Sequence, residues 1–365
     1  MKAVVMTGIN EFAVEEVELS APEKGEIRVE VKATGLCHSD ISSLNGTLPS
    51  PTPIVLGHEG AGVVVELGEG VSKFALGDHV VFTLQPVCGV CGACMDGKHV
   101  YCETATTESI LGGLLRSGKS PFTRPGGEQV YTYAGLGCMA EETVVHESSA
   151  IKVDQSYALD RACLVGCGVV TGAGGAIFGG DITAGDSVVI LGCGGVGLAA
   201  VQGAAIAGAK NIIAVDVADN KLQMAKDMGA THIINGKDGD AVEQVLRITG
   251  RGADVTLECA GVGPLIAQGF DMLRAGGVMV VIGIPPMDVT LPISAAALVF
   301  SGRTVKGGKF GCHNPVTDIP MLLEFYQQGR LDLDSMVSKT YSIDEAPQLF
   351  ADMESNTNAR GVIVF

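Results

Sequence analysis

The chain has 365 residues, a formal charge of −17, 51 glycines and no tryptophan. This length exceeds the usual size of a single hydrophobic core, so we expect two domains. The acidic balance argues against binding to nucleic acid or to anionic membranes. No signal-peptide-like apolar run begins the chain, so we expect a cytoplasmic protein whose eleven cysteines are metal ligands and core residues rather than disulfides.

The first third of the sequence is typical of a β-rich domain. Residues 26–37 (EIRVEVKATGLC) alternate polar and apolar side chains, as a half-buried strand does. Residues 60–68 (GAGVVVELG) and 77–84 (GDHVVFTL) are short β-branched runs bounded by glycine, and they predict two further strands.

From about Asp181 strand-like and helix-like segments alternate. Strands are predicted at 187–192, 211–216, 232–235, 253–261 and 276–283, and helices at 197–209 and 220–230. This alternation predicts an α/β fold with a doubly wound parallel sheet. The uncharged stretches 162–180 and 187–209 approach the length of a membrane span, but their many glycines and lack of flanking basic clusters favour buried elements. After about Lys309 the regular pattern is lost.

A glycine motif indicates a dinucleotide site. Gly192, Gly194 and Gly197 have G-x-G-x-x-G spacing between a predicted strand and a predicted helix, where glycine allows the backbone to approach a pyrophosphate. Asp216 ends the next strand, nineteen residues after Gly197. Its carboxylate can accept hydrogen bonds from the ribose hydroxyls of adenosine and would repel a 2′-phosphate, so the sequence favours NAD over NADP.

Four cysteines, Cys88, Cys91, Cys94 and Cys102, lie within fifteen residues. A redox C-x-x-C motif needs only two of them. Ferredoxin-type iron–sulfur loops space the fourth cysteine differently, and proline often follows it, whereas here Glu103 follows. We therefore favour a structural zinc held by four thiolates, which would stabilise a loop that lacks a core of its own.

A catalytic zinc would need three protein ligands and an open position. Cys37, His58, Glu59 and Cys167 are candidates, but a single cysteine is usually a core residue and a single histidine usually only hydrogen-bonded. Composition and spacing alone do not combine them into one site.

The segment Gly57-His58-Glu59, followed by Gly62, Gly68 and Val71, resembles the signature of zinc-dependent medium-chain alcohol dehydrogenases. The four-cysteine segment, GCGVVTG, the LGCGGVG…VD fingerprint, SGRTVKGGKFG and the terminal ARGVIVF extend the resemblance over the whole chain. It implies a GroES-like catalytic domain at 1–168 and 310–365, with a structural zinc lobe at 88–102, and a Rossmann NAD-binding domain at 169–309. It also implies two zinc ions per subunit, and a homodimer or homotetramer.

The resemblance assigns residues to the reaction site. The catalytic zinc ligands would be Cys37, His58 and Cys167, with Glu59 beside the metal as an occasional ligand. Asp40 would orient the ligating imidazole, and Ser39 would hydrogen-bond the substrate oxygen and begin proton release. Ser42 stands where the best-studied relatives carry the histidine that ends the proton relay, so we expect another route, through His38 or water.

The resemblance also assigns cofactor contacts. Thr171 and Val196 would hold the nicotinamide, Lys221 the adenosine ribose and Arg360 the pyrophosphate. His38 occupies a position where many relatives carry a pyrophosphate-binding arginine. The glycines expected at the cofactor are Gly192, Gly194, Gly195, Gly197 and Gly283.

The substrate is expected to be a small alcohol or aldehyde. The apolar residues 110–115 (ILGGLL) and Phe310 favour a hydrophobic or aryl primary alcohol. Three alternatives stay open. The first is a dehydrogenase for formaldehyde adducts of glutathione or mycothiol, with Arg116 and Arg124 as anion contacts; the second is an enzyme that keeps its nicotinamide bound and uses an external electron acceptor; the third is a non-catalytic zinc- and NAD-binding redox sensor.

Overall fold

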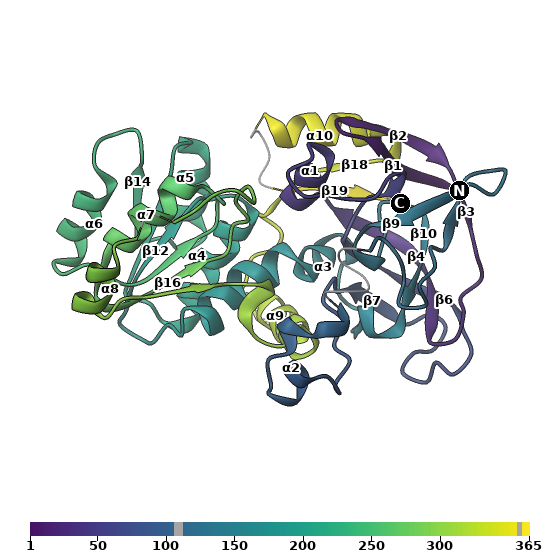
Figure 1. Cartoon of the computed structure of the whole chain (residues 1–365), viewed down its shortest axis with the longest axis horizontal. Coiled ribbons are helices and arrows are strands. Elements are labelled where there is room, and N and C mark those ends of the chain that lie inside the picture. The colour runs from purple at the N-terminus through teal and green to yellow at the C-terminus, as the bar shows by residue number, and fades with distance from the viewer. Residues whose placement is uncertain (106–111, 292, 356–359) are drawn as a thin grey trace. The chain divides into compact units, whose positions relative to one another are not determined.

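The computed structural model describes residues 1–105, 112–291, 293–355 and 360–365. The chain forms two compact units (Figure 1). Unit 1 comprises Met1–Cys167, Asn314–Glu324 and Leu333–Phe365, and unit 2 comprises Gly168–His313 and Phe325–Asp332. The domain boundaries that we expect at residues 168 and 310 stay a prediction.

Unit 1 is built on two β-sheets. The first has the strand order β2-β1-β5-β9-β8-β3; the strands are β1 Lys2–Gly8, β2 Glu11–Glu16, β3 Glu18–Leu19, β5 Ile54–Val55, β8 Phe122–Thr123 and β9 Gln129–Thr132. The second has the order β11-β7-β6-β4-β19-β18, with β10 also paired to β4; the strands are β4 Glu26–Gly35, β6 Glu59–Leu67, β7 His79–Phe82, β10 Glu142–His146, β11 Ala150–Val153, β18 Val337–Tyr341 and β19 Arg360–Val364. The three predicted strands of the first third are confirmed as β4, β6 and β7.

Short helices connect these strands and close the core of unit 1. They are α1 His38–Leu44, α2 Gly92–Met95, η1 His99–Tyr101, η3 Tyr133–Gly135, η4 Glu147–Ser149, α3 Leu159–Ala162, η5 Cys163–Gly166, the first part of α9 Pro315–Gln327, η8 Ile343–Glu345 and α10 Ala346–Glu354. Leu349 and Phe350 of α10 pack with residues of both sheets, including Val4 and Ile363, in one buried apolar cluster. Burial of these side chains from water is the main force that joins α10 to the sheets.

Unit 2 is a six-stranded sheet with the order β14-β13-β12-β15-β16-β17, in which all neighbouring strands are parallel. The strands are β12 Ser187–Leu191, β13 Asn211–Asp216, β14 His232–Asn235, β15 Ala253–Glu258, β16 Leu273–Val281 and β17 Thr304–Gly307. The helical segments are the π-helix η6 Val170–Gly179, α4 Gly195–Ala207, α5 Asp219–Asp227, α6 Ala241–Thr249, α7 Gly263–Asp271, α8 Ala295–Ser301 and η7 Phe310–Cys312. This strand order is that of a doubly wound dinucleotide-binding sheet, so the predicted fold class is confirmed.

Among the described helices, none is by itself long and apolar enough to cross a membrane. The bent pair Leu159–Gly166 and Val170–Gly179 reaches that length and composition only when its two members are taken together.

Candidate metal centres and cofactor site

Three separate segments bring four candidate metal ligands together in unit 1. Cys37 directly precedes α1, His58 precedes β6, Glu59 begins that strand, and Cys167 follows η5. The antiparallel register of β4 and β6 pairs Gly35 with Glu59. Cys37 follows the end of β4 and His58 precedes the start of β6, so this pairing brings the two residues close together. The ligand atoms of the four residues lie within 4.8 Å of one another, and all four residues are buried.

Asp40, on α1, holds His58 and the backbone around this group. Its Oδ1 lies 3.2 Å from Nδ1 of His58 and accepts a hydrogen bond from the amide of Gly57 at 3.2 Å, while its Oδ2 accepts one from the amide of Cys37 at 3.1 Å. Asp40 is fully buried. With Nδ1 committed to the carboxylate, Nε2 is the ring nitrogen of His58 that can bind a metal.

The chemistry of this group fits zinc. Within the described residues, Nε2 of His58 is buried and has no hydrogen-bond partner. A hydrogen bond with Cys167 is the main cause that lowers the pKa of the Cys37 thiol well below its ordinary value. Burial by itself would lower the pKa of His58, but the negative charges of Asp40 and Cys37 raise it to about 10. Two sulfurs and an imidazole nitrogen are donors that zinc prefers, and binding would displace the imidazole proton.

Glu59 and Arg360 form an ion pair at the edge of the metal group. Glu59 is fully buried, and Arg360, the first residue of β19, is 3 % exposed. Arg360 thus balances the charge of the acid beside the candidate metal ligands. Its contact with a pyrophosphate stays a prediction.

The second cysteine group forms the lobe at residues 88–102. The sulfurs of Cys88, Cys91, Cys94 and Cys102 lie within 4.8 Å of one another. Backbone amides of Val90 and Cys91 donate to the Cys88 sulfur and lower its pKa to about 6. All eleven cysteines, each within the described residues, are free thiols. A tetrahedral zinc with no open position fits this group.

The lobe has little apolar core of its own. Its buried cluster consists of Cys94, Cys102 and Ala105, against which the side chains of Val87, Cys88 and Cys91 pack. Two of its helical segments, α2 and η1, have only four and three residues. A segment with so little core is of the kind that a structural metal stabilises.

The glycine motif forms a close-packed turn at the carboxyl end of β12. Gly192 has φ 90°, and a Cβ added at Gly197 would lie 1.8 Å from the carbonyl oxygen of Gly192. Gly194 directly precedes α4, and Gly195 and Val196 are its first two residues. The turn therefore exposes the start of α4 to a phosphate without an intervening side chain.

Asp216 lies at the end of β13 and closes this turn. Its Oδ2 accepts a hydrogen bond from the amide of Cys193 at 2.7 Å, and its Oδ1 accepts from the amides of Val217 and Ala218 at 2.7 and 3.0 Å. Oδ2 accepts only one of these hydrogen bonds, so it has a further lone pair. Asp216 is half-buried and thus has room to accept hydrogen bonds from a ribose.

Three more predicted cofactor residues lie on different elements of unit 2. Thr171 is in η6, which packs tightly on α4: a Cβ added at Gly172 would lie 2.0 Å from the carbonyl oxygen of Val196. Lys221 is on α5, directly after the strand that carries Asp216. Gly283 follows β16. Their contacts with NAD stay predictions.

Glu258 is a residue at this edge that the sequence analysis missed. It ends β15 and is fully buried. Its Oε1 accepts hydrogen bonds from the amides of Ala260, Gly261 and Val262 at 2.9, 2.8 and 3.3 Å. Its carbonyl oxygen accepts from the amides of Ile282 and Gly283 at 2.8 and 2.9 Å. Glu258 thus fixes two loops at the carboxyl ends of the strands, where dinucleotides bind in such sheets.

The sequence signal for Glu258 is its place near the end of a predicted strand of the parallel sheet, because an ionisable group that is buried there needs dedicated partners. The loops that it binds also contact each other, since a Cβ added at Gly283 would lie 2.0 Å from the amide nitrogen of Gly261.

The remaining predicted site residues lie on or near α1. Ser39 is half-buried, and its hydroxyl oxygen is 3.8 Å from the Cys37 sulfur. His38 is the exposed first residue of the helix.

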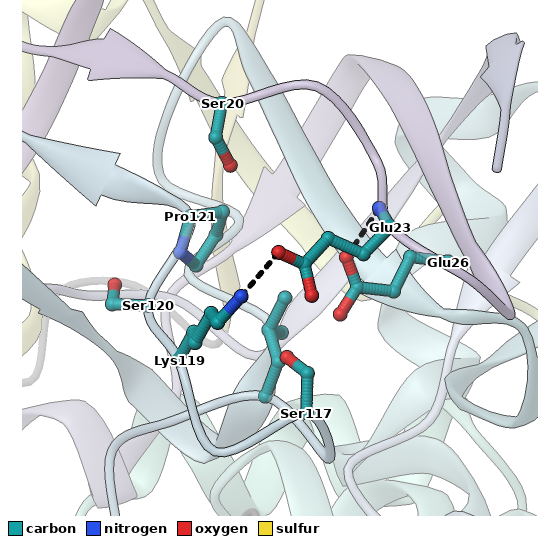
Figure 2. A pocket seen from close by; sticks show the side chains of 8 residues that line it. Ser20, Glu23, Glu26, Ser117, Lys119, Ser120 and Pro121 are labelled. Atoms are coloured by element: carbon teal, nitrogen blue, oxygen red, sulfur yellow. Dashed lines mark hydrogen bonds and ion pairs between the residues drawn. The ribbon is translucent and has the colours of Figure 1, made fainter.

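The expected apolar substrate segment is described only in part. Ile110 and Leu111 lie outside the described residues. Leu115 lines a small pocket of about 130 Å³. Glu23, Glu26 and Lys119, labelled in Figure 2, line the same pocket. Phe310 is buried in unit 2. The substrate pocket predicted from these residues stays a prediction.

A sheet of dinucleotide-binding order and a Cys-His-Cys metal group define the class of zinc-binding, dinucleotide-dependent oxidoreductases. Comparison with known proteins agrees. Residues 23–155 match the family described as alcohol dehydrogenase GroES-like domain, and residues 195–328 match the family described as zinc-binding dehydrogenase.

Full-length relatives share this organisation. The chain is 40% identical over 366 residues to the NDMA-dependent alcohol dehydrogenase of Amycolatopsis methanolica, covering 99% of this chain and 98% of that protein. It is 35% identical over 372 residues to the S-(hydroxymethyl)glutathione dehydrogenase of Paracoccus denitrificans, covering 100% and 99%. The crystal structure of benzyl alcohol dehydrogenase from Acinetobacter calcoaceticus matches with a TM-score of 0.92 and 32% identity, covering 100% of this chain and 99% of that one.

The chain belongs to the zinc-dependent medium-chain alcohol dehydrogenase family. It is a zinc-dependent alcohol dehydrogenase, an oxidoreductase with a GroES-like catalytic part and an NAD-binding fold, and zinc and NAD are its cofactors. The resemblance inferred from the sequence motifs is thereby confirmed.

Proposed function

We propose that this protein oxidises a primary alcohol with a hydrophobic or aryl group to the aldehyde, with NAD as the hydride acceptor. The observation that carries the proposal is the meeting of Cys37, His58 and Cys167 at one buried point, with Asp40 bound to the far ring nitrogen of His58. When bound there, zinc supplies Lewis acidity that favours loss of the alcohol proton, and NAD supplies the hydride acceptor.

The residues around the site would bind the metal, orient its ligands and accept the alcohol proton. Cys37, Cys167 and His58 are the three ligands, and Asp40 keeps the imidazole in one orientation. The Ser39 hydroxyl accepts a hydrogen bond from the alcohol and receives its proton. The Glu59 carboxylate, paired with Arg360, is the acid beside the ligands.

The four cysteines of the lobe at residues 88–102 hold a second, structural zinc in the same proposal. In unit 2, the residues that would hold NAD are Gly192, Gly194, Gly195, Val196 and Gly197, and Asp216 would bind its adenosine ribose. The helix N-terminus of α4 favours the negative pyrophosphate, and the Asp216 charge disfavours a 2′-phosphate.

Two observations favour an alcohol over a thiol adduct of formaldehyde. Arg124, a candidate contact for the thiol's carboxylates, already pairs with Glu15 at 2.8 Å and Glu128 at 3.0 Å. The benzyl alcohol and NDMA-dependent alcohol dehydrogenases to which the chain is similar are named for alcohol oxidation. Because the chain is also similar to the S-(hydroxymethyl)glutathione dehydrogenase, the thiol adduct of formaldehyde is the alternative substrate to be tested.

The name of the Amycolatopsis relative supports a second version of the same reaction, in which NAD stays bound and an external acceptor reoxidises it. Absorbance of the purified protein shows whether nicotinamide accompanies it. Benzyl alcohol and aliphatic alcohols should then be tested with added NAD, and separately with NDMA, and formaldehyde should be tested with glutathione and with mycothiol.

Cys167→Ala tests the metal assignment, and Cys163→Ala is its matched control, because Cys163 is also buried but lies outside the ligand group. We expect Cys167→Ala to lose one zinc per subunit and alcohol turnover, while Cys163→Ala keeps both. Equal turnover in the two variants would overturn the assignment, and a wild-type protein with two zinc ions but no turnover of any substrate would favour the redox sensor.

We also propose that the protein forms a homo-oligomer. Strand β17 is at the edge of the sheet in unit 2, and α8 exposes Val299 by 79 % and Phe300 by 91 %. An edge strand in the same unit as exposed apolar side chains is a typical site for pairing with a second copy. Light scattering should give a dimer or tetramer for the wild type and a smaller species for Phe300→Glu; monomeric wild-type protein would contradict the proposal. The cytoplasm stays its expected location.

A further inference from the structure

Helix α1 carries two adjacent serines with different surroundings. Ser42 stands where a relay histidine would be expected, and its backbone carbonyl accepts a hydrogen bond from the amide of Leu48 at 2.8 Å. Ser43 is 3 % exposed, and its hydroxyl is 2.9 Å from the hydroxyl of Tyr133 and 3.1 Å from the hydroxyl of Ser50. Ser43 therefore links two other hydroxyls through the inside of unit 1.

The inner end of this chain of hydroxyls reaches the proposed reaction site. The Tyr133 hydroxyl donates a hydrogen bond to the carbonyl oxygen of Ser39 at 3.0 Å, so it lies directly beside the residue that would receive the alcohol proton. The centroid of the Tyr133 ring is 5.4 Å from that of the His58 ring. Tyr133 is 9 % exposed.

The outer end reaches the protein surface. Ser50 is partly exposed, and Pro49 beside it is exposed. A proton that passes from Tyr133 to Ser43 and then to Ser50 therefore arrives where water can accept it.

The backbone after Tyr133 holds this side chain in place. Ala134 has φ 54°, a left-handed conformation that is rare for a residue other than glycine. The amides of Leu136 and Gly137 both donate to the carbonyl oxygen of Tyr133, at 2.9 and 3.1 Å. Such conformations persist where the surrounding structure fixes them, and they are frequent at functional sites.

We propose that Tyr133, Ser43 and Ser50 form the proton path between the alcohol site and solvent. The inference rests on the proposed alcohol oxidation. The alcohol O–H bond breaks and its proton passes to the Ser39 hydroxyl, which releases its own proton through a water to Tyr133; Ser43 and Ser50 repeat the exchange, and bulk water takes the last proton. Each hydroxyl gains one proton and loses one, and the hydride carries both electrons to NAD.

The same chain serves both directions of the reaction. In the structure the Ser50 hydroxyl donates to Ser43 and the Ser43 hydroxyl donates to Tyr133, while the Tyr133 hydroxyl donates to the backbone carbonyl oxygen of Ser39. For aldehyde reduction the Tyr133 hydrogen would turn from this carbonyl to the proposed water, and reversal of all the hydroxyl hydrogens gives the orientation needed for oxidation.

Ser43→Ala and Tyr133→Phe each remove one hydroxyl from the path, and Ser42→Ala is the matched control on the same helix. Zinc content and NADH affinity should agree within about twofold among wild type and variants, because none of these hydroxyls is a ligand. Since positioned proton transfer contributes about 10²–10⁴-fold in rate and water replaces part of the path, we expect kcat to fall at least about tenfold in Ser43→Ala and Tyr133→Phe.

A second measurement separates a proton path from a structural effect. Imidazole added to the assay can accept the proton in place of the missing hydroxyl, so it should restore much of the lost rate in both variants and leave wild type and Ser42→Ala unchanged. Ser43→Thr, which keeps a hydroxyl, should retain most activity without imidazole.

Wild-type rates in Ser43→Ala and Tyr133→Phe would overturn the proposal, and so would losses in both variants that imidazole does not restore. If the wild-type protein oxidises alcohols, either result rules out the proposed proton path and leaves the proposed function intact. If the wild-type protein oxidises no alcohol, both the proposed function and the proton path are ruled out.

Discussion

Substitution of Asp40 tests the metal site directly, because its buried carboxylate binds both chain segments that supply Cys37 and His58. Replacing it with alanine leaves three buried donors without their acceptor: Nδ1 of His58 and the amides of Gly57 and Cys37. Each unsatisfied buried donor costs about 1–3 kcal/mol, so the three amount to roughly 3–9 kcal/mol before the site relaxes. Loss of a carboxylate that orients a ligating imidazole also weakens metal binding about 10–100-fold.

We therefore expect Asp40→Ala to lower the free energy of unfolding by at least about 3 kcal/mol. We expect Asp40→Asn, which keeps one acceptor oxygen, to be more stable than Asp40→Ala, but to lose one of its two zinc ions to a chelator sooner than wild type. Urea unfolding followed by circular dichroism gives the stability, and elemental analysis after dialysis against graded chelator gives the zinc content.

Asp318→Asn is the matched control. Asp318 is 1 % exposed and accepts a hydrogen bond from the amide of Asn314 at 2.9 Å, but it lies outside both cysteine groups. This variant should lose stability and keep both zinc ions. If Asp40→Ala and Asp40→Asn retained both ions as firmly as wild type, the reasoning that couples Asp40 to the metal would be refuted.

Four other predictions concern the lobe and the sheet of unit 2. Cys94→Ser should lose one zinc and make residues 88–102 sensitive to protease, because the lobe has little core without metal; a protease-resistant variant with a single zinc would contradict this. Asp216→Ala should reduce the preference for NAD over NADP at least about tenfold, the value of a hydrogen bond to a charged group, and unchanged specificity constants would show that Asp216 does not select the ribose. Glu258→Gln should weaken NADH binding measured by fluorescence titration, whereas Asp254→Asn, at the opposite end of β15, should change stability only; equal NADH affinity in both would rule out the positioning effect. Burial alone would raise the pKa of Asp254, but Ser187 and Arg274 lower it overall, so wild type and Asp254→Asn should converge in stability as the pH falls below 3.8.

Local patterns in the sequence predict five of the six strands of unit 2 and its helices α4 and α5, but not β17, α6, α7 or α8. The central strand β12 is mostly apolar because both faces of the sheet are covered there, and it is buried at all five positions. The glycines and Asp216 have a fixed spacing from those strands, so the dinucleotide turn is visible without tertiary information. The helices α9 and α10 and the strands β18 and β19 follow Lys309, where the pattern gave no clear prediction.

The metal group in unit 1 could not be built from local patterns. Cys37 and His58 meet because of a strand register, and Cys167 arrives from a segment more than a hundred residues later. A register depends on pairing across the sheet, which a single sequence does not display. Only the resemblance to a family joined these residues, and the structure supplies the geometry.

Hydrogen-bond networks were the feature that was hardest to predict from the sequence. Glu258 binds mainly backbone amides, and Tyr133 binds Ser43 and a carbonyl group, so neither produces a motif of fixed residue types. The sequence shows that Ser42 is not a histidine, but it does not show that the adjacent Ser43 is connected to other hydroxyls.

An X-ray crystal structure with data collected on both sides of the zinc absorption edge would test the ligand assignment most directly. We predict two anomalous peaks per chain: one within about 2.4 Å of the sulfurs of Cys37 and Cys167 and about 2.1 Å from Nε2 of His58, and one among the four sulfurs of residues 88–102. A single peak at the lobe, with Cys37, His58 and Cys167 directed to different places, would contradict the account.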